Sequence, residues 1–306
     1  MPIGVIDIGT NTLLLLIVDE AMQPLVELCR FGRLGKGLDA SGRLAPDAIA
    51  ASLEICREYR RVLDQHAVVR PIVIATQAAR EARNAADFVQ PAEQILNAKI
   101  EVIGGRREAE LAATAVARTL PELAGSRYVV VDVGGGSTEL ITVDAGAVVS
   151  QVSIPIGAVR MTERHLKHDP PHAAEIAALT ADIDRHLAAL ALPHGVRVIG
   201  TAGTATTLAA LKLGLARYDP AAVTGLEISR DAVAAMVGRL IAATVAERKT
   251  FVGVEPQRAD VIAAGAAILA RIIQQIDAPV LITCDRGIRW GIAYEQVSTG
   301  GAGRAS

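Results

Sequence analysis

The sequence has little cysteine, with three such residues in a chain of 306. Cys29, Cys56 and Cys284 are odd in number, lie far apart and form no Cys-x-x-Cys pair. Disulfide frameworks and thiolate metal sites depend on paired cysteines at characteristic spacings, so this set argues against both. We expect all three to be buried thiols.

Long apolar runs are also missing. The longest, Leu13 to Val18 and Val261 to Ala270, fall far short of the roughly 20 residues that a membrane-spanning helix needs. Ahead of Ile3, where a strand-like run begins, there is no charged region, apolar core or cleavage site of the kind found in secretory signals. We therefore expect no membrane partner and a cytoplasmic location.

Neither sign of charge dominates, since 31 Lys and Arg residues stand against 33 Asp and Glu residues, for a net charge of −2. The chain therefore has no general positive field to hold a polyanion. A polyanionic ligand would need a local basic cluster, and nothing in the overall charge indicates a nucleic acid partner.

Hydrophobic residues, in contrast, make up 51% of the chain, and charged residues 21%. This composition is too apolar for disorder and is typical of a well-buried globular enzyme. A chain of 306 residues exceeds the usual size of a single hydrophobic core. We predict two domains with a ligand-binding cleft between them.

Strand-like apolar runs alternate with helical stretches, which is typical of the α/β class. In the first third, the runs Gly4 to Asp7, Leu13 to Val18 and Ile72 to Thr76 accompany an amphipathic helical stretch, Pro46 to His66. A second set of predicted elements follows: strands at Arg127 to Asp132, Glu139 to Val143, Val148 to Pro155, Val196 to Gly200 and Val280 to Cys284, and a helix from about His172 to Leu190.

The two sets look like copies of one another. In Val5 to Thr12 and in Val130 to Thr138, an Asp ends a strand just before a turn that contains Gly. The intervals from Asp7 to Asp19 and from Asp132 to Asp144 are equal. An internal duplication of a phosphate-binding hairpin predicts two related domains that share one polyphosphate.

We place the N-terminal domain at 1–122, completed by a C-terminal helix at about 288–299, and the second domain at 123–287. Residues 300–306 are Gly, Ala and Ser with one Arg, and we predict that they form a disordered tail.

Both Gly-containing turns carry candidate phosphate ligands. Glycine permits positive φ, which would let successive amides of Gly134, Gly135 and Gly136 form a concavity for phosphate oxygens, while Ser137 and Thr138 add hydroxyl donors. In the first copy the corresponding candidates are Thr10, Asn11 and Thr12. The alternative interpretation is an ordinary Gly-rich hairpin turn.

Carboxylates lie next to these turns. Alignment of the copies on Asp7 and Asp132 places Glu139 at the position of Leu14, so a charge occupies a core position. Metal coordination or the orientation of an attacking water would explain a buried charge there, and a solvent-facing edge residue is the alternative. Asp132, and Asp7 in its copy, are candidate Mg²⁺ ligands, and capping of the turn is the alternative role for Asp132.

Three further elements could contribute. Gly203 and Thr204 follow a strand and begin a helix, where anions bind favourably. Arg80 follows Ile72 to Thr76 at another helix start and could bind phosphate in a bidentate manner, although a solvated surface Arg fits equally well. Glu108 stands in the first turn of a helix after Gly104 and Gly105, which locally indicates only an acid near a positive helix end.

Three of the six histidines, His165, His168 and His172, have spacings that suggest a metal site. Pro170 and Pro171 interrupt them, and no continuous helical face can then present all three rings. We therefore predict no metal site there.

Together the motifs resemble the exopolyphosphatase and guanosine pentaphosphate phosphohydrolase (Ppx/GppA) family, a branch of the actin-like superfold. The resemblance covers nearly the whole chain, and its stretches are Asp7 to Thr12, Ala75 to Arg80, Gly105 to Leu111, Asp132 to Leu140, Ile154 to Arg160, Gly200 to Thr204 and Arg258 to Ile262.

The resemblance implies two actin-like ATPase (ribonuclease H-like) domains with an interdomain cleft. It implies Glu108 as the catalytic base, Asp132 and Glu139 in water activation and Mg²⁺ binding, and phosphate contacts from Arg80 and Ser137. The family often carries an acidic residue at the position of Arg107 and a basic one at that of Glu110, so the charge pattern around Glu108 is altered.

The function implied is Mg²⁺-assisted hydrolysis of the terminal phosphoanhydride of inorganic polyphosphate, with short chains favoured. Guanosine pentaphosphate is the alternative substrate, because it presents the same terminal group. An ATP-dependent kinase of the same superfold and a non-catalytic sensor of guanosine polyphosphate or polyphosphate remain as alternatives of other classes. The resemblance also allows a homodimer. A further set of basic residues could guide a polyphosphate chain: Arg30, Arg33, Lys36, Arg83, Arg106 and Arg107.

Overall fold

The chain divides into two compact α/β units in the computed structural model, which describes residues 2–302. Unit 1 comprises Met1–Ala115 and Ile288–Ser306, and unit 2 comprises Val116–Gly287. Helix α5 (Gly105–Thr119) begins in unit 1 and ends in unit 2. Of the predicted tail, residues 300–302 belong to helix α13 (Ile288–Ala302), and residues 303–306 lie outside the described residues.

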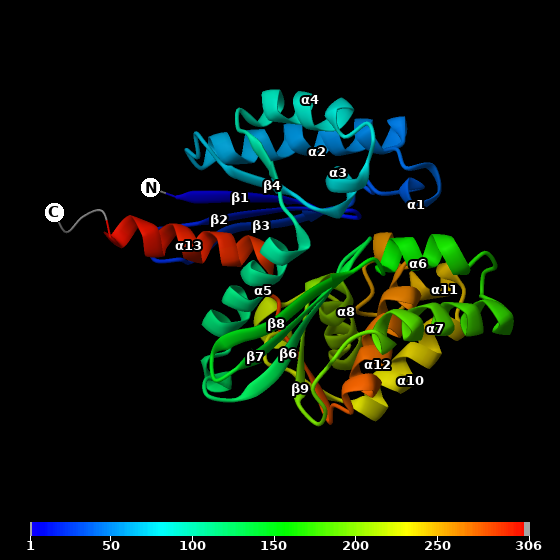
Figure 1. Ribbon diagram of the computed structural model, residues 1–306. Coiled ribbons are helices and arrows are strands. Elements are labelled where there is room, and N and C mark those ends of the chain that lie inside the picture. The colour runs from blue at the N-terminus through cyan, green and yellow to red at the C-terminus, as the bar shows by residue number, and fades with distance from the viewer. Residues whose placement is uncertain (1, 303–306) are drawn as a thin grey trace. The chain divides into compact units, whose positions relative to one another are not determined.

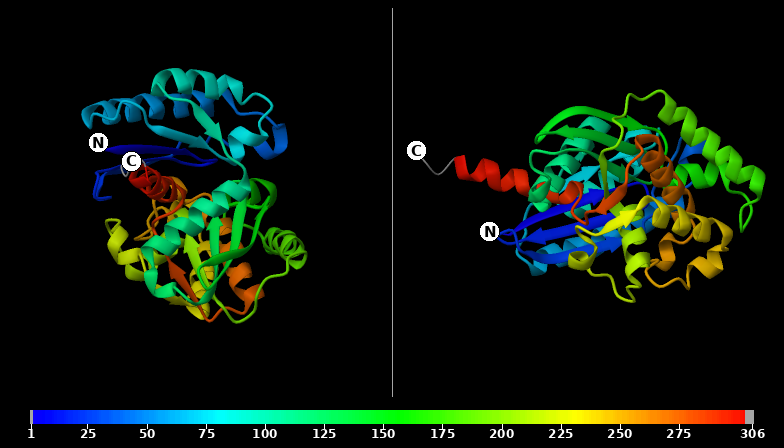
Figure 2. Two further views of the ribbon diagram at one scale, coloured as in Figure 1. Left: turned by 60° about the vertical axis from the view of Figure 1, so that its left-hand side comes forward. Right: turned by 90° about the horizontal axis from the view of Figure 1, so that it is seen from below.

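Unit 1 is built on a five-stranded sheet in the order β3-β2-β1-β4-β5. Its strands are β1 (Ile3–Ile8), β2 (Leu13–Val18), β3 (Pro24–Arg30), β4 (Ile72–Ala75) and β5 (Ile100–Val102). The first three form an antiparallel meander, whereas β4 and β5 run parallel to β1. Helices α2 (Pro46–Gln65) and α4 (Ala86–Leu96) cover one face and α13 lies along the other (Figure 1). The start of β1 and the end of α13 lie at the same end of this unit (Figure 2).

The central strands of unit 1 are apolar on both faces because both faces are covered. Ile6 and Ile8 belong to the core under α2 and α4, whereas Val5 belongs to the core that contains Trp290 of α13. Alternate residues of a strand point to opposite faces, so a strand buried on both sides needs consecutive apolar residues. This requirement explains the unbroken run of β2, Leu13 to Val18.

Unit 2 repeats the same arrangement with one added strand. Its sheet has the order β10-β11-β9-β6-β7-β8. The strands are β6 (Arg127–Val133), β7 (Thr138–Asp144), β8 (Ala147–Ile154), β9 (Arg197–Thr201), β10 (Glu227–Ser229) and β11 (Val280–Thr283). Without β10, the order β8-β7-β6-β9-β11 corresponds to β3-β2-β1-β4-β5 of unit 1. The predicted α/β class and the internal duplication are confirmed.

The helices of unit 2 enclose a large apolar core. They are α6 (Ala158–His165), α7 (Ala173–Ala188), α8 (Ala202–Leu213), α10 (Arg230–Ala242) and α12 (Ile262–Ile276), with short helices α9 (Pro220–Val223) and α11 (Val245–Arg248). In α12, 11 of 15 residues are buried, which explains its apolar sequence. Within residues 2–302, no helix combines the length and the apolar character needed to cross a bilayer.

The two hairpins match in their hydrogen bonds as well as in topology. The Gly9 amide donates to the Thr12 carbonyl at 2.9 Å, and the Gly134 amide donates to the Ser137 carbonyl at 3.0 Å. Asp7 pairs in register with Leu14, and Asp132 with Glu139. The predicted equivalence of Leu14 and Glu139 is therefore confirmed.

Two expectations about local structure are wrong. Cys29 is exposed, because it lies on β3 at the edge of its sheet, while Cys56 and Cys284 are buried as expected. The expected positive φ is also not found at Gly134. Among the glycines of unit 2, Gly146 in the β7–β8 turn does have a positive φ, of 83°. A side chain at Gly134 is disfavoured by a steric contact, since a Cβ there would lie 3.1 Å from the Ser137 carbonyl oxygen.

The glycine turn of unit 2 is held by the start of α6. The Gly134 and Gly135 carbonyls accept hydrogen bonds from the Ala158 and Val159 amides at 2.9 and 2.8 Å. A Cβ on Gly157 would lie 2.5 Å from the backbone of Gly135, closer than real contacts allow. Only glycine at position 157 lets the helix start approach the turn this closely.

Replacement of Gly157 tests this contact. Gly157→Ala should lower the free energy of unfolding by about 1–3 kcal/mol, because the obstructing atoms are backbone. Gly238→Ala is the control in the same unit: it is exposed inside α10 with nothing within 4 Å, so alanine should raise stability by about 0.5–1 kcal/mol. Urea unfolding followed by circular dichroism measures both, and a neutral Gly157→Ala variant would contradict the close approach.

Candidate functional site

Two carboxylates stand side by side on adjacent strands of the unit 2 sheet, next to the turn that joins β6 to β7. Asp132 on β6 and Glu139 on β7 are direct partners in the antiparallel register, so their side chains lie on the same face. Their exposed fractions are 6% and 2%. Ser153 on β8 donates from Oγ to Glu139 Oε1 at 2.7 Å. Because β7 lies between β6 and β8 and Glu139 is buried, the interpretation of Glu139 as a solvent-facing edge residue is excluded.

The hydroxyls beside the glycine turn differ in what they can do. Thr138 is fully buried and donates from Oγ1 to the Ile156 carbonyl at 2.6 Å. Its proton is therefore used to hold the β8–α6 connection. Ser137 is 6% exposed and lies at the turn itself. Of the two, Ser137 is the better placed to bind a ligand through its side chain.

The turn of unit 1 is held on two sides. Thr10 donates from Oγ1 to Gln77 Oε1 at 2.8 Å, and its carbonyl accepts from the Gly35 amide at 2.8 Å. The Asn11 carbonyl accepts from the Arg33 amide at 3.0 Å. Thr10 and Asn11 are buried and Thr12 is partly exposed. These bonds fix the turn that follows Asp7, itself 8% exposed.

Glu108 and Arg80, which the sequence places far apart, meet in unit 1. Arg80 lies in the short helix α3 (Gln77–Glu81) after β4, and Glu108 lies in the first turn of α5 after β5. Strands β4 and β5 are adjacent and parallel, so the segments that follow them emerge at the same edge of the sheet. The Ile103 amide donates to the Ala75 carbonyl at 2.9 Å and fixes this edge.

The geometry of this pair is that of a buried acid held by a cation. Arg80 Nη1 donates to Glu108 Oε1 at 2.8 Å and to the Ile103 carbonyl at 2.6 Å. The Glu108 side chain is 5% exposed and that of Arg80 is 30% exposed. Burial raises the pKa of Glu108 above its ordinary value, and the Arg80 hydrogen bond and charge partly oppose that rise. Glu108 does lie in the first turn of α5, as the local pattern indicated, but the pattern gave no sign of its burial or of its bond to Arg80.

The junction of β9 and α8 lies beside Arg258, a cation to which the sequence analysis gave no role. Strand β9 passes directly into α8, with Ala202 in the left-handed region at φ 58°. The guanidinium of Arg258 lies so close to Gly203 that any Cβ there would overlap it. Thr204 is 2% exposed and packs against Gly265 of α12. In the sequence, Arg258 could have been singled out only as part of the stretch Arg258 to Ile262, which contributes to the family resemblance.

Most of the basic residues predicted to guide a substrate are engaged in ion pairs. Arg30 pairs with Glu58 at 2.8 Å, Lys36 with Asp47 at 3.4 Å and Arg106 with Glu110 at 3.1 Å. Arg107 binds both carboxylate oxygens of Glu295 on α13. Arg107 therefore attaches α13 to α5.

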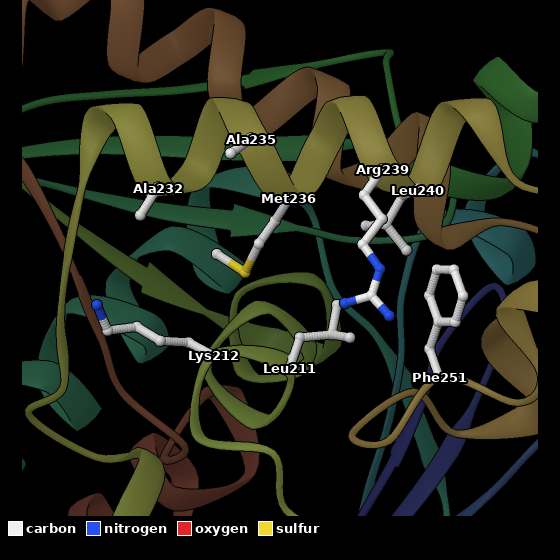
Figure 3. A pocket seen from close by; sticks show the side chains of 8 residues that line it. All are labelled: Leu211, Lys212, Ala232, Ala235, Met236, Arg239, Leu240 and Phe251. Atoms are coloured by element: carbon white, nitrogen blue, oxygen red, sulfur yellow. The ribbon is translucent and has the colours of Figure 1, made fainter.

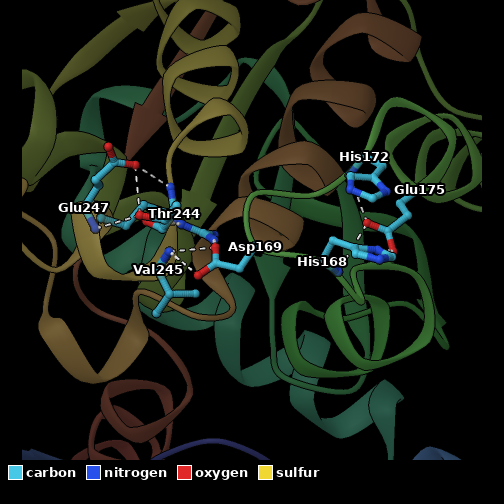
Figure 4. Close-up of polar contacts among 8 residues, drawn as sticks. His168, Asp169, His172, Glu175, Thr244, Val245 and Glu247 are labelled. Atoms are coloured by element: carbon cyan, nitrogen blue, oxygen red, sulfur yellow. Dashed lines mark hydrogen bonds and ion pairs between the residues drawn. The ribbon is translucent and has the colours of Figure 1, made fainter.

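Of the three histidines whose spacing suggested a metal site, His165 and His168 contact carboxylates of unit 2 through their rings, and Figure 4 shows the group around His168. His168 Nδ1 lies 3.0 Å from Glu175 Oε1, and the rings of His168 and His172 stack with centroids 3.8 Å apart. The His168 hydrogen bond lowers the pKa of Glu175 to about 2. His165 Nε2 lies 2.7 Å from Asp182 Oδ2. In residues 2–302, no three His, Cys, Asp or Glu side chains form a cluster that could hold a metal ion by themselves.

Comparison with known proteins matches this architecture to one family. The model of the Ppx/GppA phosphatase family matches residues 14–299. Exopolyphosphatase 2 of Mycobacterium tuberculosis is 34% identical over 290 residues, which cover 90% of each chain. The chain belongs to the Ppx/GppA phosphatase family.

Solved structures agree with the Ppx/GppA assignment. An exopolyphosphatase-like protein superimposes with a TM-score of 0.90 at 31% identity, over 98% of this chain and 99% of that one. An Aquifex aeolicus Ppx/GppA family member gives 0.80 at 31% identity, over 100% and 99%. An exopolyphosphatase from Cytophaga hutchinsonii gives 0.89 at 27% identity, over 98% of each chain.

These matches confirm two predictions made from the motifs. The Ppx/GppA chain has two units of the actin-like ATPase fold, and it is an enzyme of the hydrolase class. The individual site residues stay predictions, which the contacts described above make more specific.

The raised pKa of Glu108 predicts a pH-dependent stability difference. An unfolded Glu has a pKa of about 4.3. Between that value and the higher folded pKa, the folded state holds a proton that the unfolded state has lost, so stability falls as pH rises. The unfolding free energy of the wild type minus that of Glu108→Gln should decrease through this window and be flat outside it. Denaturant titrations at successive pH values measure it, and a difference that rises with pH would show that the Arg80 bond outweighs burial.

Proposed function

We propose that this Ppx/GppA chain is an exopolyphosphatase, which hydrolyses the terminal phosphoanhydride of inorganic polyphosphate with water and Mg²⁺. The observation that carries the proposal is the buried Glu108 carboxylate with a raised pKa, held at one oxygen by Arg80. The names of the Mycobacterium tuberculosis and Cytophaga hutchinsonii relatives support the choice of substrate. Short polyphosphates are the proposed length class, and chains of defined length test it.

Glu108 is the proposed general base. A base works best when its pKa lies near the operating pH, and burial moves this carboxyl upward from its ordinary acidic value. Arg80 binds Oε1, so Oε2 is the oxygen proposed to accept the proton of the attacking water. The hydroxide equivalent then attacks phosphorus, and the shortened polyphosphate leaves with the bond electrons of the bridging oxygen.

Asp132 and Glu139 are the proposed ligands of Mg²⁺. Two nearly buried carboxylates on one face of a sheet repel each other unless a cation or a proton lies close. Mg²⁺ prefers hard oxygen ligands and commonly combines one or two carboxylates with water and substrate phosphate, which fits a site of fewer than three protein acids. When bound, the ion would neutralise charge that develops on the phosphate oxygens. Asp7 is the corresponding candidate ligand in unit 1.

Four segments of the chain are proposed to bind the phosphate oxygens of the substrate. These are the turn at Thr10, Asn11 and Thr12, the turn from Gly134 to Thr138, the α8 start at Gly203 and Thr204, and Arg80. We add Arg258, because its guanidinium lies directly over Gly203. For Thr138 only main-chain donation is proposed, since its hydroxyl proton is bound by Ile156.

Removal of the proposed base is the first test. Glu108→Gln should lower the rate of phosphate release from polyphosphate by about 10²–10⁴-fold, because the general base is lost. Polyphosphate binding should be kept. Glu110→Gln, a half-exposed acid on the same helix, should change the rate less than twofold. Phosphate release from defined-length polyphosphate and from guanosine pentaphosphate is measured for all three proteins.

A fully active Glu108→Gln variant would overturn the assignment of the base. Phosphate release from guanosine pentaphosphate but not from polyphosphate would identify the nucleotide as the substrate. Binding of either compound without phosphate release would indicate a sensor.

The Arg80 contact predicts the pH dependence. Arg80 lowers the pKa of Glu108, so its removal should raise that pKa further. The acid limb of the pH profile of kcat/KM should therefore move to higher pH in Arg80→Met. Arg61→Met, an exposed residue of α2, provides the control and should leave the limb in place. A lower kcat/KM at every pH without movement of the limb would assign Arg80 to phosphate binding alone.

A further inference from the structure

A pocket in unit 2 lies away from all of these residues. It has a volume of about 270 Å³ and opens between the end of α8, one face of α10 and the segment that contains Phe251 (Figure 3). Its apolar wall consists of Leu211, Ala232, Ala235, Met236, Leu240 and Phe251. Leu211 lies eight residues after Gly203 on α8, a distance of about 12 Å along a helix. The pocket is therefore separate from the phosphate-binding start of α8.

Two cations complete the wall, and they distinguish the pocket from an ordinary surface groove. Lys212 and Arg239 line opposite ends of it, with Met236 between them (Figure 3). The eight described lining residues include no acid. Within residues 2–302, neither cation forms an ion pair or a hydrogen bond. Arg230, on the same helix as Arg239, is paired with Asp277.

The contact that Arg239 does make indicates the kind of ligand. Its guanidinium carbon lies 4.1 Å from the centre of the Phe251 ring. Stacking covers one flat side of the guanidinium, while the N–H groups on its edge stay able to bind a carboxylate or phosphate in a bidentate manner. Phe and Met side chains in general make favourable contacts with aromatic rings, and Phe251 and Met236 both line the pocket. The lining thus combines partners for a flat ring with a bidentate anion donor.

We propose that this pocket binds a small aromatic anion, in which one or two fused rings fill the apolar part and an acidic group binds Arg239. The volume supports this size class: it lies near the lower limit of about 300 Å³ for ligand pockets and is far too small for a helix about 10 Å across. Lys212 provides the second charge at the other end. The site is additional to the proposed phosphohydrolase site and uses none of its residues.

Binding of naphthalene-2-carboxylate to the full chain tests the proposal. Isothermal titration calorimetry should detect one site. Naphthalen-2-ylmethylammonium, which has the same ring body and the opposite charge, should bind at least tenfold more weakly. Inorganic phosphate, which has charge without rings, should not displace the carboxylate. Equal binding of the ammonium compound, or no binding of the carboxylate, would overturn the proposal.

Variants locate the site. Arg239→Gln should weaken naphthalene-2-carboxylate binding about tenfold or more, because a charge-assisted bidentate contact is lost. Ala235→Trp should abolish binding by filling the pocket. Ala234→Trp, which places the same side chain on an exposed position of α10 that does not line the pocket, is the matched control. Unchanged binding in Ala235→Trp, or an equal loss in Ala234→Trp, would show that the ligand binds elsewhere. Phosphate release should be the same in all three variants.

Discussion

One backbone hydrogen bond, made once in each unit, sets the geometry on which the candidate site depends. It closes the turn after the first strand of each sheet, from Gly9 to Thr12 and from Gly134 to Ser137. Closure in this form sends the second strand back beside the first, so the aspartate before the turn stands in register with the seventh residue after it. Asp7 and Asp132 therefore lie near the end of the first strand of each unit, where they are 8% and 6% exposed.

The sequence was sufficient to predict those features of the fold and the candidate site that leave a pattern within one short segment. Equal spacing of Asp and Gly predicted two copies of one hairpin, and apolar runs alternating with helical stretches predicted the α/β class. Glu139 shows how far this reasoning reaches, since alignment with Leu14 alone indicated a charge in a core position, and the structure places it there at 2% exposure.

Local sequence patterns do not show which distant segments meet. Nothing local distinguishes Glu108 from a solvated acid, because its burial arises from the adjacency of β4 and β5, which brings Arg80 to it. Arg258 was missed for the same reason: its nearness to Gly203 depends on how the segment before α12 packs on α8. The expectation for Cys29 failed because sequence alternation does not show which strand lies at a sheet edge.

The two units are copies in topology but not in chemistry, and the difference lies in two places. Helix α5 follows β5 and carries Glu108 in its first turn, whereas α13 follows β11, the corresponding strand, and has no acid there. Conversely, β7 carries Glu139 where β2 carries Leu14.

A buried carboxylate opposes folding unless a cation, a proton or hydrogen bonds compensate it. Each unit therefore has buried charge at a different position of an otherwise apolar core. Each tolerates that charge because its sheet is stabilised by extensive apolar packing. In unit 1 the packing comes from α2, α4 and Trp290, and in unit 2 from α12, most of which is buried. Duplication supplied a fold stable enough to hold charges in its interior, and the copies then differ in which charges they hold: a carboxylate bonded to Arg80 in one and a carboxylate pair on adjacent strands in the other.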